Sequence, residues 1–137
     1  MAELLIQRKL ESLHRCVMRI EARCPDTVAE LEGNLDLQDI LVLNITRAVQ
    51  LCVDLAMHRL SQLNEPVPET MGSAFEALAR RKLLDTELAE RLRKAVGFRN
   101  IAVHNYEVIN WAIVHAIATR YLDDFAQFAR AMLADAQ

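Results

Sequence analysis

The chain has 137 residues, which fits a single domain, residues 1–137, closing one apolar core. Hydrophobic residues make up 53% of it, and only 3 glycines and 3 prolines interrupt the pattern, which favours long helices over many short strands. The net charge is −3, the N-terminus lacks the apolar segment of a signal peptide, and the longest charge-free apolar run, residues 108–118, is too short to cross a bilayer.

Three cysteines, Cys16, Cys24 and Cys52, are an odd number in a chain without an export signal. Their spacings match no zinc-binding pattern, so we interpret them as reduced, partly buried thiols. We therefore expect a cytoplasmic protein with no membrane association, no metal site and no cofactor.

The first predicted helix has one apolar face and ends before Pro25, because proline disfavours helical geometry in the residue that precedes it. A break follows at Gly33 and Asn34, and Asp36 is positioned to cap the next helix. The residues that form the apolar face recur at steps of three and four: Ile6, Leu10, Leu13, Val17, Ile20 and Cys24.

Residues 37–63 are apolar on most faces, so this helix should form the buried centre of a bundle or lie in an oligomer interface. Arg47 and Asp54 are two turns apart on the same face of it. Charges on such a helix are costly unless they are paired. They either line a cleft between two subunits or mark a partly exposed edge.

A linker with two prolines, residues 64–68, precedes a short helix around Phe75 and Leu78. Asp85 or Thr86 can cap the helix that follows, which runs into residues 97–107. Residues 108–134 predict one long final helix, in which Asp124 is the only charge on the apolar face. The sequence thus predicts an all-α fold, a four- to five-helix up-down bundle.

Charge is unevenly distributed along the chain. Residues 1–79 carry seven basic and twelve acidic side chains, whereas residues 80–99 carry seven basic and three acidic ones. This positive segment can contact an anionic partner, or it can be an arginine-rich helix face exposed to solvent. Its candidate substrate-positioning residues are Arg80, Arg81, Lys82 and Lys94.

The positive segment leads into GFRNIAVHNYE, residues 97–107. Arg99 offers a fork of donors for phosphate oxygens, and His104 is a side chain that can exchange a proton near neutral pH. On a regular helix the two are separated by about 140° and ~7.5 Å. Asn100 can orient a phosphate or the imidazole, while Asn105 is a residue type at which helices end. These groups suit RNA cleavage without a metal, although the same residues could simply cap a helix C-terminus.

Residues 99–106, RNIAVHNY, resemble the R-x4-H-x-Y signature of the HepT-like toxins of the HEPN superfamily. These toxins occur beside a small nucleotidyltransferase antitoxin (MNT). The likeness extends to DLQDILVLNITRAVQLCVDLA, FEALARRKLL and YLDDFAQF. The motif positions show no departure. The resemblance implies a HEPN-like helical fold.

The resemblance also implies an activity and a switch. Arg99 and His104 correspond to the catalytic pair of a metal-independent endoribonuclease acting on cellular RNA, and Asn100 to its polar assistant. Tyr106 matches the tyrosine that the antitoxin adenylylates, which would repel RNA by adding negative charge. The implied assembly is a homodimer with two motifs facing one cleft, and Asn105, Arg47 and Asp54 are further candidates for positioning substrate.

A different class of function is also open at this point. The overall acidity favours a non-catalytic helical dimer that binds a nucleotide or regulates the nucleotidyltransferase, because free-standing nucleic-acid-binding proteins tend to be basic.

Overall fold

The computed structural model describes residues 2–135, and every described element is helical. The prediction of an all-α fold is confirmed. The number of helices exceeds the four to five expected. Within the described residues they are α1 (Ala2–Arg23), α2 (Val28–Glu32), α3 (Leu35–Gln62), α4 (Met71–Arg80), α5 (Thr86–His104), the 3-10 helix η1 (Tyr106–Val108), α6 (Trp111–Thr119) and α7 (Asp123–Asp135).

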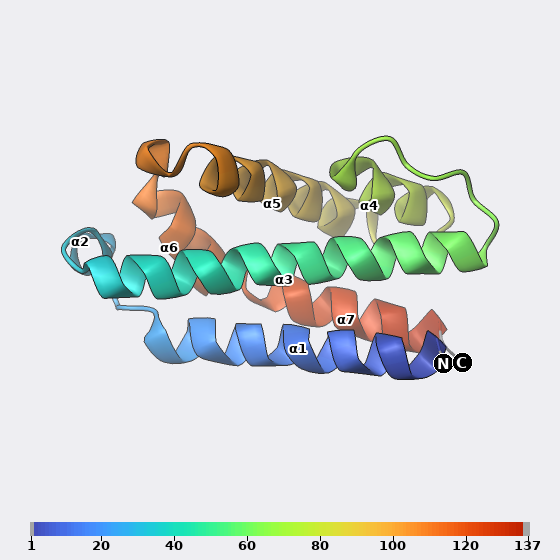
Figure 1. Ribbon diagram of the computed structural model, residues 1–137, viewed down its shortest axis with the longest axis horizontal. Coiled ribbons are helices and arrows are strands. Elements are labelled where there is room, and N and C mark those ends of the chain that lie inside the picture. Colours follow the sequence, from blue (N-terminus) through green and yellow to red (C-terminus); the bar gives the residue numbers. More distant parts are fainter. Residues whose placement is uncertain (1, 136–137) are drawn as a thin grey trace.

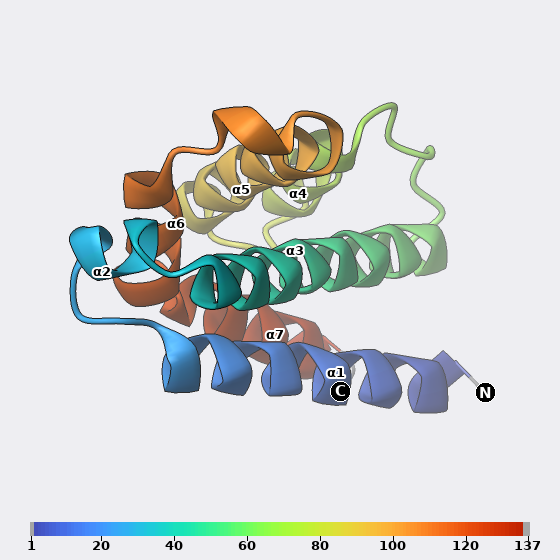
Figure 2. The same cartoon turned by 60° about the vertical axis from the view of Figure 1, so that its left-hand side comes forward.

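The four long helices α1, α3, α5 and α7 alternate in direction, as expected of an up-down bundle (Figure 1). The helix α3 lies at the centre and contacts each of the other α-helices. Figure 2 shows α4 and α5 on one side of α3, with α1 and α7 on the other. The prediction that this helix forms the buried centre of the bundle is therefore confirmed.

The helix α3 is also long and apolar enough to cross a membrane, with a mean hydropathy of 1.6 over its best window. However, 56% of that window is buried inside the bundle, as in the core helix of a soluble protein. The core around it includes Phe75 and Phe128, whose rings meet edge to face at 5.7 Å. Burying an aromatic side chain of this kind contributes about 2–3 kcal/mol.

Polar side chains set the starts of the helices. Asn34, not Asp36, caps α3: its Oδ1 accepts a hydrogen bond from the Leu37 amide at 3.1 Å. The predicted cap was therefore two residues too late, and Asp36 lies in the first turn, where its charge faces the positive end of the helix dipole. Thr27 caps the short helix α2, which was not predicted, and Asp85 caps α5 as expected.

The prediction of one helix over residues 108–134 is wrong, because the chain turns twice within this segment. Asn110 caps α6 by accepting from the Ala112 amide at 2.9 Å. At the other end, the Thr119 hydroxyl donates to the His115 carbonyl at 2.7 Å, a local bond that competes with regular helix. The break lets α6 pack against α2 and α3 while α7 packs against α1, α3 and α5.

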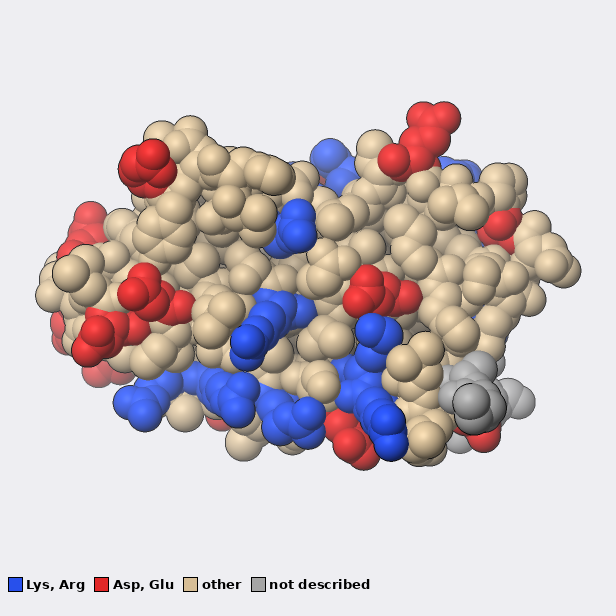
Figure 3. All heavy atoms as spheres, in the orientation of Figure 1, with Lys and Arg blue, Asp and Glu red and all other residues tan. Residues whose placement is uncertain are grey.

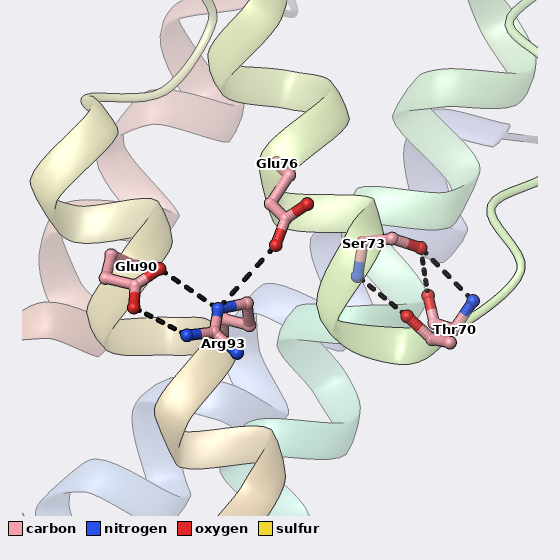
Figure 4. A network of polar contacts seen from close by, with 5 residues as sticks. All are labelled: Thr70, Ser73, Glu76, Glu90 and Arg93. Atoms are coloured by element: carbon pink, nitrogen blue, oxygen red, sulfur yellow. Dashed lines mark hydrogen bonds and ion pairs between the residues drawn. The ribbon is translucent and has the colours of Figure 1, made fainter.

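The helices α4 and α5 form a close hairpin (Figure 4). Arg93 Nη2 donates to Glu90 at 2.6 Å, and its Nε lies 3.6 Å from Glu76 on α4. A Cβ atom at Gly72 would lie 2.9 Å from Arg93 Cγ, so glycine permits this approach. Thr70 and Ser73 form a reciprocal capping box at the start of α4.

The three cysteines are free thiols, as predicted: Cys16 and Cys52 are buried, and Cys24 is partly buried. Burial raises the pKa of all three thiols, which keeps them protonated at neutral pH.

Candidate active site at the C-terminal end of α5

The motif spans the end of α5 and the turn that follows it. The helix continues without interruption through His104, and the Asn105 amide closes its last turn by donating to the Ile101 carbonyl at 2.8 Å. The expectation that helical geometry stops near Asn105 is confirmed. Since Arg99 and His104 occupy one regular helix, they project from faces about 140° apart.

Arg99 and Asn100 contact each other directly. The Arg99 Nη1 donates to the Asn100 Oδ1 at 3.1 Å, so the amide orients the guanidinium rather than the imidazole. Arg99 is partly buried, whereas Asn100 and His104 are exposed. A fixed guanidinium with free donors beside a solvent-accessible imidazole is an arrangement that can bind a phosphodiester and transfer a proton.

Tyr106 begins η1 and contacts α3, a helix far away in the sequence. Its hydroxyl donates to the Asp39 Oδ1 at 2.8 Å, and its ring meets that of Trp111 edge to face at 6.1 Å. The side chain nevertheless remains 40% exposed. The phenol is therefore held in one position and can still be reached by another protein.

Burial, followed by the hydrogen bond to Asp39 and the charge of that carboxylate, raises the pKa of Tyr106 to about 12. At neutral pH the phenol is thus protonated. A phenol of this kind becomes a nucleophile only when a base accepts its proton, and the Asp39 carboxylate already accepts its hydrogen bond.

Asp39 was missed in the sequence because it lies 67 residues before Tyr106. Only the folding of η1 onto the start of α3 brings the two together, so no local spacing could have indicated the pair. Trp111 packs against the core as expected.

The predicted positioning residues lie in four different places. Arg80 ends α4, and Arg81 and Lys82 follow it in the turn before α5, whose rise from Thr86 to His104 is about 27 Å. Arg81 pairs with Glu65 at 2.8 Å. Lys94 lies on α5 beside a hollow of about 270 Å³ between α5, α6 and α7. Asn105 is adjacent to Tyr106 at the C-cap.

Arg47 and Asp54 both face α1. Asp54 accepts from Lys9 Nζ at 3.2 Å and from Gln50 Nε2 at 2.9 Å. Arg47 lines a hollow with Arg15 and other residues of α1. The candidate positioning residues are therefore divided among the α4–α5 turn, the α5–α7 groove, the α1–α3 groove and the C-cap of α5.

The charge on the apolar face of α7 has a structural partner. The Arg91 Nε donates to both carboxylate oxygens of Asp124, at 3.1 and 3.0 Å. Asp124 is buried, and the guanidinium of Arg91 has its pKa raised chiefly by this hydrogen bond. The sequence singled out Asp124 as the only charge on that face, but it did not indicate that Arg91 is its partner. Within residues 2–135, no three His, Cys, Asp or Glu side chains converge as a metal site.

Comparison with known proteins identifies the fold and its chemistry. The family model described as "Ribonuclease HepT-like" matches residues 13–132. The chain belongs to the HepT-like ribonuclease family. The curated relative "mRNA nuclease HepT" of Shewanella oneidensis is 35% identical over 124 residues, covering 90% of this chain and 92% of the relative.

Solved structures of toxin–antitoxin complexes contain a chain with the same fold. A tri-AMPylated Shewanella oneidensis HEPN toxin, in complex with its MNT antitoxin, superposes with a TM-score of 0.88 at 34% identity and covers 94% of this chain and 96% of its own. A toxin–antitoxin complex with AMP-PNP gives a TM-score of 0.85 at 32% identity, with coverage of 93% and 96%. The HEPN-like fold is thus confirmed, and this HepT-like chain is an endoribonuclease of the toxin–antitoxin class.

Proposed function

We propose that this HepT-like ribonuclease cleaves cellular RNA with Arg99 and His104, and that its nucleotidyltransferase partner silences it by adenylylating Tyr106. The observation that carries the proposal is the placement of the motif at the C-terminal end of α5 and in η1, which follows directly after the C-cap Asn105. The catalytic pair and the phenol lie within eight residues of one another at one helix end, and both His104 and Tyr106 are accessible.

The cleavage step needs only groups of the RNA and of this site. A ribose 2′-hydroxyl attacks the adjacent phosphorus, and the bond from phosphorus to the 5′-oxygen breaks. His104 transfers protons during this exchange, and Arg99, held by Asn100, stabilises the charge that develops on the phosphate oxygens. The products are a 2′,3′-cyclic phosphate and a 5′-hydroxyl. The name of the curated relative points to messenger RNA as the substrate class.

A homodimer completes this arrangement. Because Arg99 and His104 point to different faces of α5, groups from two copies can share one phosphate across a twofold axis. Exposed apolar side chains support an interface near the motif, namely Leu43, Ile101, Val103 and Val108. Two copies of the motif would then border one cleft.

The silencing step uses the phenol of Tyr106. Its oxygen attacks the α-phosphorus of ATP, pyrophosphate leaves, and the phenolic proton passes to a base, for which Asp39 is in position at 2.8 Å. Each AMP adds a negative charge and bulk next to Arg99 and His104, which disfavours a second phosphate backbone there. The solved tri-AMPylated relative in complex with an MNT antitoxin supports a partner of that class.

The test is an intact-mass measurement on protein expressed alone and with a partner nucleotidyltransferase, followed by an RNA cleavage assay on both samples. We expect a gain of one or more AMP units, and cleavage only by the unmodified protein. The chain has two tyrosines, so Tyr121 provides a matched control. Tyr106→Phe should abolish the mass gain and Tyr121→Phe should retain it. Modification that persists in Tyr106→Phe would refute the assignment.

A further inference from the structure

The strongest cation cluster outside the motif lies on α1 and α3. The helix α1 carries arginines on one face, at steps of seven, four and four residues: Arg8, Arg15, Arg19 and Arg23. Figure 3 shows the resulting band of positive charge over α1, with further basic atoms above it on α3. The first 79 residues are acidic in total, so this band is invisible in the composition of that segment.

Three guanidinium groups, two from this band and one from α3, line one hollow of about 370 Å³ between α1 and α3. Arg15 and Arg19 come from α1, and Arg47 comes from α3. Its remaining lining residues are Ser12, Cys16, Gln50 and Leu51. Burial raises the pKa of the Cys16 thiol, and the charges of the same three arginines lower it by a smaller amount. The three cations therefore share one small volume.

No described carboxylate pairs with Arg15, Arg19 or Arg47. The nearby Asp54 pairs with Lys9 instead. Like charges four residues apart on a helix, as in Arg15 and Arg19, repel each other. Arg15, Arg19 and Arg47 are all exposed, so water and salt screen this repulsion and their positive potential is available to an anion.

The hollow lies on the same helix as the contact of Tyr106. Arg47 is eight residues after Asp39 on α3, which corresponds to about 12 Å along the helix. Eight residues also correspond to about 80° of rotation, so the hollow lies to one side of the Tyr106 contact, and a single RNA strand bound at the end of α5 would cross α3 to reach it. The cations in the α4–α5 turn lie beyond the far end of α5, whose length is about 27 Å, and one of them is paired, so they suit this role less well.

We infer that Arg15, Arg19 and Arg47 form a binding groove for the phosphate backbone of the single-stranded RNA that this ribonuclease cleaves. The inference rests on the proposed function, since it extends the substrate path of the same site. Guanidinium groups match phosphate oxygens in geometry, and contacts to the backbone hold a strand without reading its sequence. Gln50 and Ser12 add polar groups at the edge of the groove.

The experiment measures binding and cleavage separately. The double variant Arg15→Gln/Arg47→Gln removes one cation from each helix, and Arg120→Gln/Arg130→Gln removes two exposed arginines from outside the groove. A His104→Ala background and a labelled single-stranded RNA allow binding to be followed by fluorescence anisotropy over a range of salt concentrations. Catalytically intact versions provide KM and kcat.

We expect the groove variant to bind about tenfold more weakly near 0.15 M salt and to lose about 1.4 from the slope of log K against log salt, because each phosphate contact contributes about 0.7 for single strands. Its KM should rise while kcat stays near that of the parent. The control should keep the parent slope and KM.

A groove variant that retains the parent slope and KM would overturn the inference while leaving the ribonuclease intact. Loss of nucleotidyltransferase binding without loss of RNA binding would also overturn it, because the groove would then hold an acidic protein surface. RNA binding through the groove by a protein that never cleaves would instead refute the proposed catalysis and retain the groove.

Discussion

The two ends of α5 carry similar side chains and use them differently. Toward the N-terminal end, the cations are matched by carboxylates: Arg93 with Glu90 and Glu76, and Arg91 with the buried Asp124. At the C-terminal end, Arg99 contacts an amide and His104 faces solvent. One helix thus stabilises the bundle at its start and presents unneutralised groups at its end.

This difference separates an arginine that is already ion-paired from one that can still bind an anion. Arg91 and Arg99 both lie on the same helix in a basic segment, so composition does not distinguish them. The hydrogen-bond partner distinguishes them. A guanidinium that already donates to both oxygens of a carboxylate has little capacity left to bind a phosphate. Substitutions at the two ends should accordingly have effects of different kinds.

The largest effect is expected at the C-terminal end. His104→Ala should lower kcat for RNA cleavage by about 10²–10⁴-fold, because a proton-transfer group is lost, and should leave the melting temperature nearly unchanged. A gel-based cleavage assay and a thermal melt measure the two quantities. His14→Ala, an exposed histidine on α1, is the control and should keep full activity. If the His104→Ala protein stayed active, the C-terminal end of α5 would not carry the proton-transfer group.

The next effect is expected in the N-terminal half of α5. Asp124→Ala leaves Arg91 without its partner and should lower the free energy of unfolding by about 2 kcal/mol, less than for a fully buried pair because Arg91 is partly exposed. Urea unfolding measures this loss. The kcat of the remaining folded protein should be near the parent value. If kcat fell with unchanged stability, Asp124 would belong to the site and not to the scaffold.

A smaller effect concerns the Tyr106 contact. The pKa of this phenol is about 12 in the folded protein, above its ordinary value of 10.0, so the stability it contributes is fully present below pH 10 and is lost as the pH rises through about 12. Asp39→Asn should lower the pKa partway toward the ordinary value, because burial still acts. The same variant should slow adenylylation without changing RNA cleavage by unmodified protein.

The absorbance of the phenolate, measured against Tyr106→Phe, isolates this titration from that of Tyr121. Asp36→Asn, one turn earlier on α3, is the matched control. A pKa that stays at about 12 in Asp39→Asn would contradict the assigned contact.

The smallest effect is expected for the exposed pair at the start of α5. Glu90→Gln removes an ion pair in which both side chains are nearly half exposed, at 48% and 44%, so the loss of stability should be the smallest of these effects and should diminish at high salt. Thermal melts at two ionic strengths test this. A larger loss would show that the α4–α5 hairpin depends on that pair, and would sharpen the contrast between the two ends of α5.

Much of the fold was predictable because helix periodicity and helix ends are local properties. The apolar face of α1, the stop before Pro25, the cap at Asp85 and the buried character of α3 all follow from neighbouring residues. The errors concern the positions of helix ends, which residue spacing alone does not fix. Asn34, not Asp36, caps α3, and α6 ends at Thr119, whose hydroxyl donates to the His115 carbonyl of the same helix.

By itself, the sequence determined the helical class and the R-x4-H-x-Y groups, because these depend on residue type and short spacing. The tertiary structure alone decided which charges are paired and which are available. It joined Tyr106 to Asp39, neutralised Arg91 with Asp124, and gathered Arg15, Arg19 and Arg47 around one hollow. The physical reason is that electrostatic interactions depend on distance in space, and a helical bundle brings together side chains that are tens of residues apart in the chain.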